Sequence, residues 1–284
     1  MEPAERVAAN VARVRERIAL AAKRAGRDPA DVTLVAITKS RGRQIFPLLA
    51  AAGILDVGEN RALEGIEKAA GAPGGLRWHL AGHLQTNKVR KALRLFRIIH
   101  SVDSIRLARV IDEEALHGLP PEEQMLVKVR DELFGSSWER LIADLLDRIA
   151  GRPFETNLVE RIRSDIERIE RLRNGYIDAF IEINSGEMQK SGLHADELED
   201  FLSEARSLKR IRWVGLMTMA PYSASPEDAR PHFGRLRELR DKGSSNGFPT
   251  LRSLSMGMSG DFEVAVEEGA THVRVGRALF EGLP

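Results

Sequence analysis

The feature that most constrains the fold of this chain is a regular alternation between short apolar runs and longer amphipathic stretches. Each apolar run is bounded by turn residues and has the length of a buried strand. The eight runs are VTLVAIT (32–38), DVGE (56–59), RWHLAGHL (77–84), IIHSVD (98–103), DAFIEIN (178–184), IRWVGLMTM (211–219), TLRSLS (250–255) and HVRVG (272–276). Eight strands separated by helices predict an α/β protein, a parallel (β/α)₈ TIM-like barrel. A doubly wound open sheet is the alternative, because periodicity does not show closure.

An amphipathic segment precedes the first strand. Its apolar residues, which include Val7, Val11, Val14 and Ile18, recur at helical spacing, so we expect an N-terminal helix packed on the core. Acidic residues interrupt the segment, which therefore is not a signal peptide. No apolar run in the chain reaches the length of a membrane span, and we expect a cytoplasmic protein without a membrane partner.

One connection is too long for a barrel turn. It lies between the helical stretch that ends near Gly118 and the strand that starts near Tyr176. Apolar residues within it recur on helical faces on both sides of the turn signal Gly151-Arg152-Pro153. We therefore predict that residues 119–175 are a helical insertion, a hairpin, within a single domain that spans residues 1–284.

Composition excludes several classes of function. The chain has 284 residues and a formal net charge of +1, from 43 basic and 42 acidic residues, so no global field favours nucleic acid or an anionic membrane. Aromatic residues are only 5%, too few for a base-stacking platform. The absence of cysteine excludes disulfides, thiolate metal sites and cysteine nucleophiles.

Lys39 ends the first apolar run. In a parallel barrel, ligands bind at the carboxyl ends of the strands. An amine at the mouth of such a pocket can form a Schiff base with a carbonyl compound. The alternative is that the strand simply reaches the surface at this point and the ammonium group is solvated, as lysines at strand ends often are.

The last two strand ends carry glycine-rich loops. SLSMGMSG places Gly257 and Ser259 just before a helix, and HVRVGRALF places Gly276 after the last strand. Glycines let the backbone approach a ligand, and loops after strands seven and eight are the usual phosphate site in this fold. Taken singly, Ser259 could be a helix cap and the glycines turn residues; together at this place they favour a phosphate site.

Two histidines have the sequence spacing of some metal-binding pairs. His79 and His83 are four residues apart, which suits zinc on a helix. On a strand-like run, however, this spacing separates the side chains by about 13 Å. We therefore expect no metal here and a packed or ligand-facing His79.

An ordered set of motifs resembles one known family. The set comprises Lys39, Asn60, WHLAGHLQTNK (78–88), NSGEMQKSG (184–192), GLMTMAP (215–221), SLSMGMSGD (253–261) and VRVGRALF (273–280). In this order they resemble the pyridoxal-phosphate homeostasis protein family, whose single barrel is similar to the N-terminal domain of alanine racemase. The resemblance covers the chain except for residues 119–175.

The resemblance implies a site for pyridoxal 5′-phosphate (PLP). It makes Lys39 the Schiff-base lysine and places Arg274 at the pyridine nitrogen, with Asn60 and His79 around the ring. The 5′-phosphate is then held by two loops, whose members are Ser255, Gly257, Met258, Ser259, Gly276 and Arg277. Arg277 stands where a threonine or serine is frequent in the family.

The function implied by the resemblance is intracellular PLP homeostasis, by a carrier or buffer without significant turnover and without catalytic residues. Its partners are PLP and the PLP-dependent apo-enzymes that receive it. Arg274 beside the ring nitrogen disfavours protonation there, and we expect no second domain after Pro284 to supply a second base. A PLP-dependent amino-acid racemase and a Schiff-base aldolase on a phosphorylated sugar are the alternatives. We expect a monomer, with a dimer through the insertion as the alternative.

Overall fold

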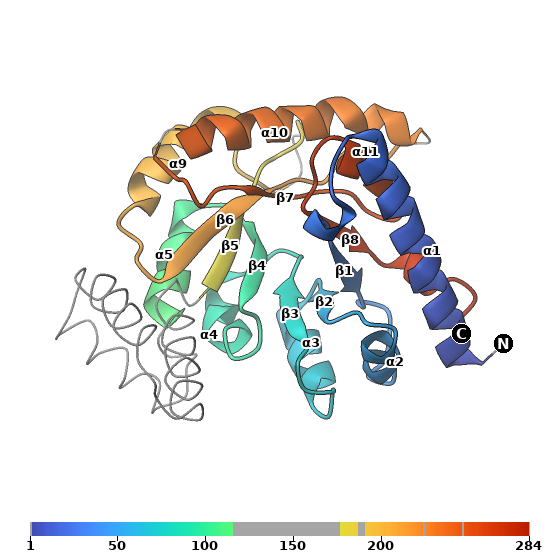
Figure 1. The fold of residues 1–284 in the computed structure, drawn as a ribbon. Coiled ribbons are helices and arrows are strands. Elements are labelled where there is room, and N and C mark those ends of the chain that lie inside the picture. Colours follow the sequence, from blue (N-terminus) through green and yellow to red (C-terminus); the bar gives the residue numbers. More distant parts are fainter. Residues whose placement is uncertain (1, 116–176, 187–190, 224, 246, 284) are drawn as a thin grey trace, which may run out of the picture.

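The computed structural model describes residues 2–115, 177–186, 191–223, 225–245 and 247–283. Eight parallel strands form a closed barrel in chain order, and β1 pairs with both β2 and β8 (Figure 1). The strands are β1 (Thr33–Ile37), β2 (Asp56–Glu59), β3 (Arg77–Leu80), β4 (Ile98–Val102), β5 (Ile177–Glu182), β6 (Ile211–Met217), β7 (Ser253–Ser255) and β8 (His272–Val275). This confirms the predicted barrel and excludes the open sheet.

Helices surround the barrel. The α-helices are α1 (Pro3–Arg24), α2 (Ile45–Ala51), α3 (Ala62–Ala69), α4 (Val89–Ala92), α5 (Ile105–Ala115), α9 (Leu198–Ala205), α10 (Arg230–Ser245) and α11 (Phe262–Glu267). Short 3₁₀-helices are η1 (Pro29–Asp31), η2 (Thr86–Lys88), η4 (Ala195–Glu197), η5 (Pro226–Ala229) and η6 (Arg277–Leu279). Among the described residues, no helix combines the length and the apolar character that crossing a bilayer requires.

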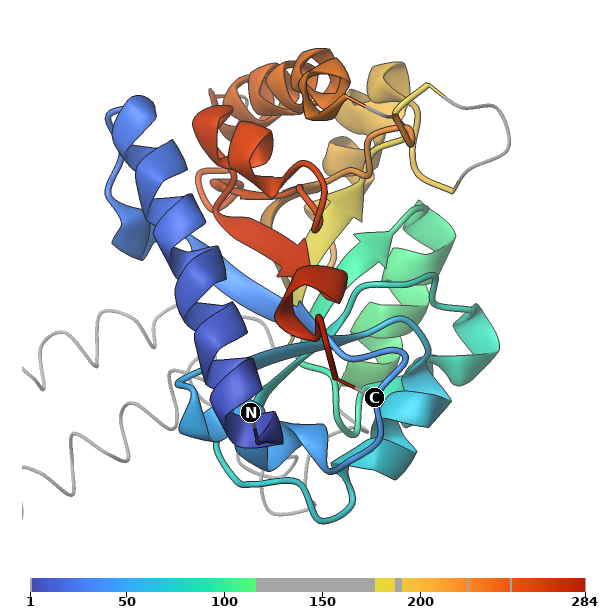
Figure 2. The same ribbon diagram turned by 90° about the vertical axis from the view of Figure 1, so that its right-hand side faces the viewer.

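The N-terminal helix α1 closes the outer ring of helices. After β8 the described chain forms only the short helix η6, and α1 fills the gap by packing against α11 on one side and α2 on the other. Both views place α1 along the outside of the barrel, with the two termini at the same end of the molecule (Figure 2). The buried Asn10 of α1 donates to the carbonyl oxygens of Leu279 and Glu281, which fastens the C-terminal segment to the helix.

Side chains alternate along each strand between the helical layer and the barrel interior. On β8, Val273 and Val275 belong to the hydrophobic core under the helices, whereas Arg274 contacts Ser255 of β7. The interior also holds His79, His100 and other buried polar groups, where barrels of this fold mostly place branched aliphatic residues.

The structure differs from the sequence-based expectation at β3. The strand ends at Leu80, although the apolar pattern continues to Leu84. At Gly82 the chain comes so close to β2 that an added Cβ would lie 2.2 Å from the carbonyl oxygen of Asn60. His83 is therefore beyond the strand. The predicted insertion, residues 119–175, lies outside the described residues.

Candidate functional site

Lys39 lies two residues beyond β1, at the carboxyl end of the barrel, and is exposed. The residue before it is tightly held. Thr38 is buried, its N–H donates to the carbonyl of Gly58, and its hydroxyl donates to Glu59 Oε1 over 2.5 Å. The backbone is therefore fixed immediately before Lys39, while the amine extends toward solvent.

A buried ion pair supports the same segment. The ammonium of Lys68, on α3, lies 2.9 Å from Glu59 Oε1 and donates to the carbonyl of Thr38 over 2.9 Å. Glu59 is fully buried, and its other oxygen, Oε2, has no hydrogen-bond partner within the described structure. The pair thus ties the end of β1 to the end of β2 and to α3.

The loop after β7 requires its glycine. Gly257 has φ +91°, and a Cβ there would lie 2.5 Å from Cβ of Ala265. Only glycine adopts this conformation without strain. The N–H of Arg274 donates to the carbonyl of Gly257, and the N–H of Met258 donates to Asp261 Oδ1 over 2.6 Å, so the loop is bound to β8 and to the residue that precedes α11.

Ser259 joins this loop to the one after β8. Its hydroxyl oxygen accepts hydrogen bonds from the N–H groups of Gly276 and Ala278, each 3.3 Å away. A Cβ at Gly276 would lie 3.1 Å from the carbonyl oxygen of Ile37, which shows how closely this loop approaches the end of β1. Two N–H groups thus converge beside the strand end that precedes Lys39, an arrangement suited to an anion.

The loops after β1, β2, β7 and β8 surround the carboxyl end of the barrel, which we call the mouth. The other predicted site residues of the mouth are accessible. Arg277 and Met258 are exposed, and Asn60 is half-buried at the end of β2. The guanidinium of Arg41 donates to the carbonyl of Phe280 and lies 5.4 Å from the centre of its ring, which connects the Lys39 loop to the C-terminal segment. The mouth therefore concentrates basic side chains and N–H groups.

Arg274 is buried at the base of this mouth. Its Nη1 donates to Ser255 Oγ over 2.6 Å, and its Nη2 donates to the carbonyl of Thr218 over 3.0 Å. Burial lowers the pKa of Arg274 to about 10, against the opposing effect of Glu182 and Asp261. The guanidinium is consequently charged at neutral pH and held in one orientation.

Two carboxyl groups lie near Arg274, the buried Glu182 and the half-buried Asp261. Burial raises the pKa of Glu182, which accepts a hydrogen bond from Ser191 over 3.0 Å. Burial likewise raises the pKa of Asp261, whose Oδ1 accepts a hydrogen bond from the N–H of Met258. Across the described ranges, no three His, Asp or Glu side chains converge closely enough to hold a metal ion.

His79 lies deeper in the barrel than the mouth residues. Its Nδ1 is 2.9 Å from His100 Nε2 and its Nε2 is 2.9 Å from Asp56 Oδ1. His100 in turn lies 2.7 Å from Ser255 Oγ. The structure thus brings His79 and Ser255 together with Arg274 through buried hydrogen bonds; contact of either with a cofactor stays a prediction.

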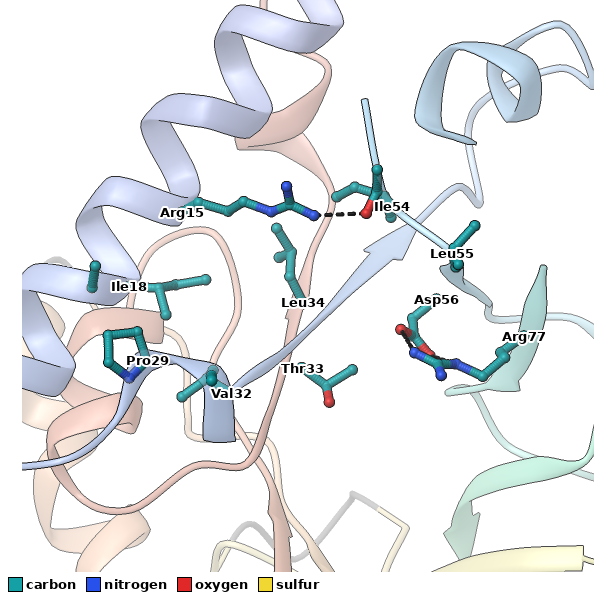
Figure 3. Close-up of a pocket in the computed structure, with 13 residues that line it drawn as sticks. Arg15, Ile18, Pro29, Val32, Thr33, Leu34, Ile54, Leu55, Asp56 and Arg77 are labelled. Carbon is teal, nitrogen blue, oxygen red and sulfur yellow. Dashed lines mark hydrogen bonds and ion pairs between the residues drawn. The ribbon is translucent and has the colours of Figure 1, made fainter. Parts of the chain in front are cut away.

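The amino end of the barrel holds a cavity of about 510 Å³ between α1, η1 and the first residues of β1, β2 and β3 (Figure 3). Its cations are already bound to protein. Arg77 contacts both oxygens of Asp56, with its Nε 2.7 Å from Oδ1, and Arg15 donates to the carbonyl of Gly53. The cavity lies at the opposite end from Lys39.

Sequence reasoning missed several residues of the mouth and interior. Glu59, the last residue of the run 56–59, is recognised as a polar strand-end residue but is given no role, and His100 lies inside the apolar run 98–103, where a polar residue is the signal that could have found it. Lys68 gave no signal, because on α3 it resembles any lysine on a solvated helix face.

The comparisons with known proteins agree with this fold. Residues 159–284 match the family described as the N-terminal domain of alanine racemase. Among solved structures, alanine racemase from Corynebacterium glutamicum superposes with a TM-score of 0.60 at 15% identity, over 99% of this chain and 63% of that one. The class is therefore an alanine racemase N-terminal-like barrel.

Curated relatives define the family. The pyridoxal phosphate homeostasis protein of Aquifex aeolicus is 34% identical over 272 residues, 95% of each chain. The protein of the same name from Pseudomonas aeruginosa is 32% identical over 276 residues, 96% of this chain and 94% of the relative. The chain belongs to the pyridoxal phosphate homeostasis protein family.

A solved structure of PipY from Synechococcus elongatus is described as having PLP bound. It superposes with a TM-score of 0.64 at 28% identity, covering 94% of this chain and 99% of that chain. A crystal structure described as that of an unknown protein from Bifidobacterium adolescentis superposes with a TM-score of 0.73 at 28% identity, over 99% of this chain and 97% of that one.

Proposed function

We propose that this protein binds PLP at the carboxyl end of the barrel, as a Schiff base with Lys39, and serves as an intracellular carrier or buffer of the cofactor without significant turnover. The observation that carries the proposal is the convergence of three strand ends. Lys39, the loop at Gly257 to Ser259 and the N–H groups of Gly276 and Ala278 surround one mouth.

The donor set fits the cofactor's anionic group. The N–H groups of Gly276 and Ala278 already point at one oxygen, that of Ser259, and a phosphate oxygen is a stronger acceptor than a hydroxyl. Arg277 is exposed beside them and supplies positive charge. Gly257 lets this loop pack directly against Ala265 and Phe262 of α11, where a Cβ would clash, and so fixes the loop beside the Gly276 and Ala278 N–H groups.

Lys39 supplies the reversible covalent bond. Its unprotonated amine attacks the aldehyde carbon, and the carbonyl oxygen leaves with the two amine protons as water. Hydrolysis reverses the step and returns the free aldehyde. A recipient apo-enzyme that offers its own lysine can then take up the cofactor, which is the chemistry that a carrier needs.

The environment of Arg274 favours storage over turnover. PLP supplies an electron sink when its ring nitrogen is protonated, and a carboxylate partner keeps it so in many enzymes. Arg274 is a charged donor without acceptor capacity, and it is locked by Ser255 and Thr218. A guanidinium beside the ring nitrogen therefore weakens the sink.

The decisive experiment is a spectrum of the purified protein loaded with PLP. We expect a visible absorption band that borohydride erases, and peptide mass spectrometry that locates the reduced cofactor on Lys39. Absence of the band with binding of a phosphorylated sugar instead would favour the aldolase. Measured racemisation of alanine or another amino acid at an enzymatic rate would favour the racemase over the carrier.

A further inference from the structure

A chain of buried hydrogen bonds crosses the barrel interior from the mouth toward the amino end. It runs from Arg274 Nη1 to Ser255 Oγ (2.6 Å), to His100 Nδ1 (2.7 Å), from His100 Nε2 to His79 Nδ1 (2.9 Å), and from His79 Nε2 to Asp56 Oδ1 (2.9 Å). The five residues come from β8, β7, β4, β3 and β2. The chain therefore links strands on opposite sides of the barrel.

The proton positions can be assigned from the Asp56 end. Burial raises the pKa of Asp56, but hydrogen bonds from His79 and Arg77 outweigh it and lower the pKa to about 2. At neutral pH this carboxylate is ionised and can only accept. His79 therefore carries a proton on Nε2.

Because His100 is neutral, the protons along the chain can be placed in two ways. Burial, together with the nearby His79, His272 and Arg274, holds the pKa of His100 well below its usual value, so this ring is neutral and has a single N–H. If His79 is also neutral, His100 Nε2–H donates to His79 and Ser255 donates its hydroxyl proton to His100. If His79 is charged, it donates to His100, and His100 donates to Ser255.

Only the first arrangement satisfies Ser255. This residue is fully buried, and its oxygen contacts two groups in the described structure, Arg274 and His100. Arg274 always donates, so in the second arrangement both neighbours would donate and the hydroxyl proton would have no acceptor. In the first, each contact joins one donor to one acceptor, and every proton points away from Arg274 toward Asp56.

We propose that Ser255, His100 and His79 are positioning residues that hold the Arg274 guanidinium at the base of the cofactor mouth through a one-way hydrogen-bond chain anchored on Asp56. Phe180 stacks on His100 with ring centres 4.4 Å apart and keeps the ring in place. The role toward the cofactor rests on the proposed function; the chain itself does not. It follows that the hydroxyl of Ser255 is committed to Arg274 and His100.

The first test uses the protein without cofactor. Imidazole ¹⁵N resonances of the full chain, labelled on histidine, report which nitrogen carries the proton. We expect His79 and His100 both to be neutral and protonated on Nε2 at neutral pH. A doubly protonated His79, or an Nδ1–H in either ring, would overturn the chain whatever the protein binds.

The second test uses a matched pair of variants in the PLP-loaded protein. In His100→Asn the amide oxygen can accept the Ser255 proton in place of Nδ1, whereas His100→Leu has a similar volume and no acceptor. We expect His100→Leu to weaken PLP affinity about tenfold and to shift the absorption maximum and its pH dependence. His100→Asn should restore most of both.

Ser253→Ala, two residues before Ser255 on β7, is the control and should match the wild type. Equal shifts in the Asn and Leu variants, or none in a folded Leu variant, would refute the positioning role. If His100→Leu does not fold, Ser255→Ala replaces it and should reproduce the spectral shift. Failure of the wild-type protein to bind PLP would refute the proposed function. The hydrogen-bond chain would then be tested by the histidine ¹⁵N resonances alone.

Discussion

The two ends of the barrel both hold arginines and carboxylates, yet they are in different chemical states. At the amino end, Arg77 is bound to Asp56 and Arg15 to a backbone carbonyl, although a cavity lies between them (Figure 3). At the carboxyl end, Lys39 and Arg277 are exposed and backbone N–H groups converge on a single hydroxyl.

This difference leads us to propose the binding site at the carboxyl end, although the cavity lies at the amino end. What matters is whether the cations are already paired, since displacing a bidentate carboxylate costs a ligand much of its own interaction energy. At the carboxyl end Lys39, the proposed nucleophile, and Arg277 are exposed, whereas at the amino end Arg77 is bound to Asp56 and Arg15 to the carbonyl of Gly53. Five changes test this contrast.

The largest effect is expected from Lys39→Ala, which should abolish the covalent attachment of PLP and leave the fold intact, because the side chain is exposed. Some PLP should remain bound through the phosphate loops. Borohydride reduction followed by mass spectrometry measures the attachment, and Lys242→Ala on α10 is the matched control. An undiminished reduced adduct in Lys39→Ala would place the Schiff base on another lysine.

Lys68→Met should destabilise the protein by about 3–5 kcal/mol, because it leaves the fully buried charge of Glu59 without its cation. The control is Lys242→Met, which breaks the exposed pair with Glu199 and should cost about 1 kcal/mol or less. Denaturant unfolding measures both. Equal losses of unfolding free energy in the two variants would show that the Lys68–Glu59 ion pair contributes no more to stability than an exposed pair.

Gly257→Ala should cost about 1–3 kcal/mol of unfolding free energy and weaken PLP binding, because the new Cβ requires a positive φ and meets Ala265 at 2.5 Å. Gly260→Ala in the same loop is the control, since its Cβ would meet no atom within 4 Å. Chemical denaturation and a PLP titration report the two effects. The contrast fails if both alanine variants behave alike.

Stability should fall on acidification below about pH 6.5. Burial lowers the pKa of His272 to about 3 and that of His100 well below its usual value. Below about pH 6.5 these two imidazoles therefore bind protons in the unfolded chain but not in the folded one. Each histidine therefore removes up to about 1.4 kcal/mol of unfolding free energy per pH unit.

The charged and titratable groups around these two rings are Asp56, Arg77, His79 and Arg274. Asp56 adds a further loss only as the pH falls from 3.8 toward 2, because its folded pKa is lowered. Unfolding free energies at pH 7 and pH 5 measure the slope. His100→Asn should reduce this slope by up to one proton, because the lowered pKa of His100 is then absent.

The smallest effect is expected at the amino-end cavity. Arg15→Ala removes a cation and one exposed hydrogen bond to Gly53, so PLP affinity should stay within about twofold and stability within about 1 kcal/mol. A PLP titration and thermal unfolding measure these values. A loss of affinity comparable to that of Gly257→Ala would show that the two ends of the barrel are coupled.

The sequence by itself determined the repeating units and the direction in which each strand points its side chains. Apolar periodicity predicted the eight strands and the N-terminal helix, and alternation placed Arg274 opposite Val273 and Val275. The same local rule placed Lys39 and Gly276 at strand ends. These features follow from backbone geometry over a few residues, which the sequence states directly.

Only the tertiary structure decided which interior side chains meet. Asp56, His79, His100, Ser255 and Arg274 are spread over five strands, and their contacts depend on how the closed barrel staggers those strands. The same closure made α1 a member of the outer ring, and the pairing of β2 with β3 brought the backbone at Gly82, just beyond β3, against Asn60. Local periodicity fixes the face on which a side chain lies, whereas its partner on that face is set by contacts between residues distant in the chain.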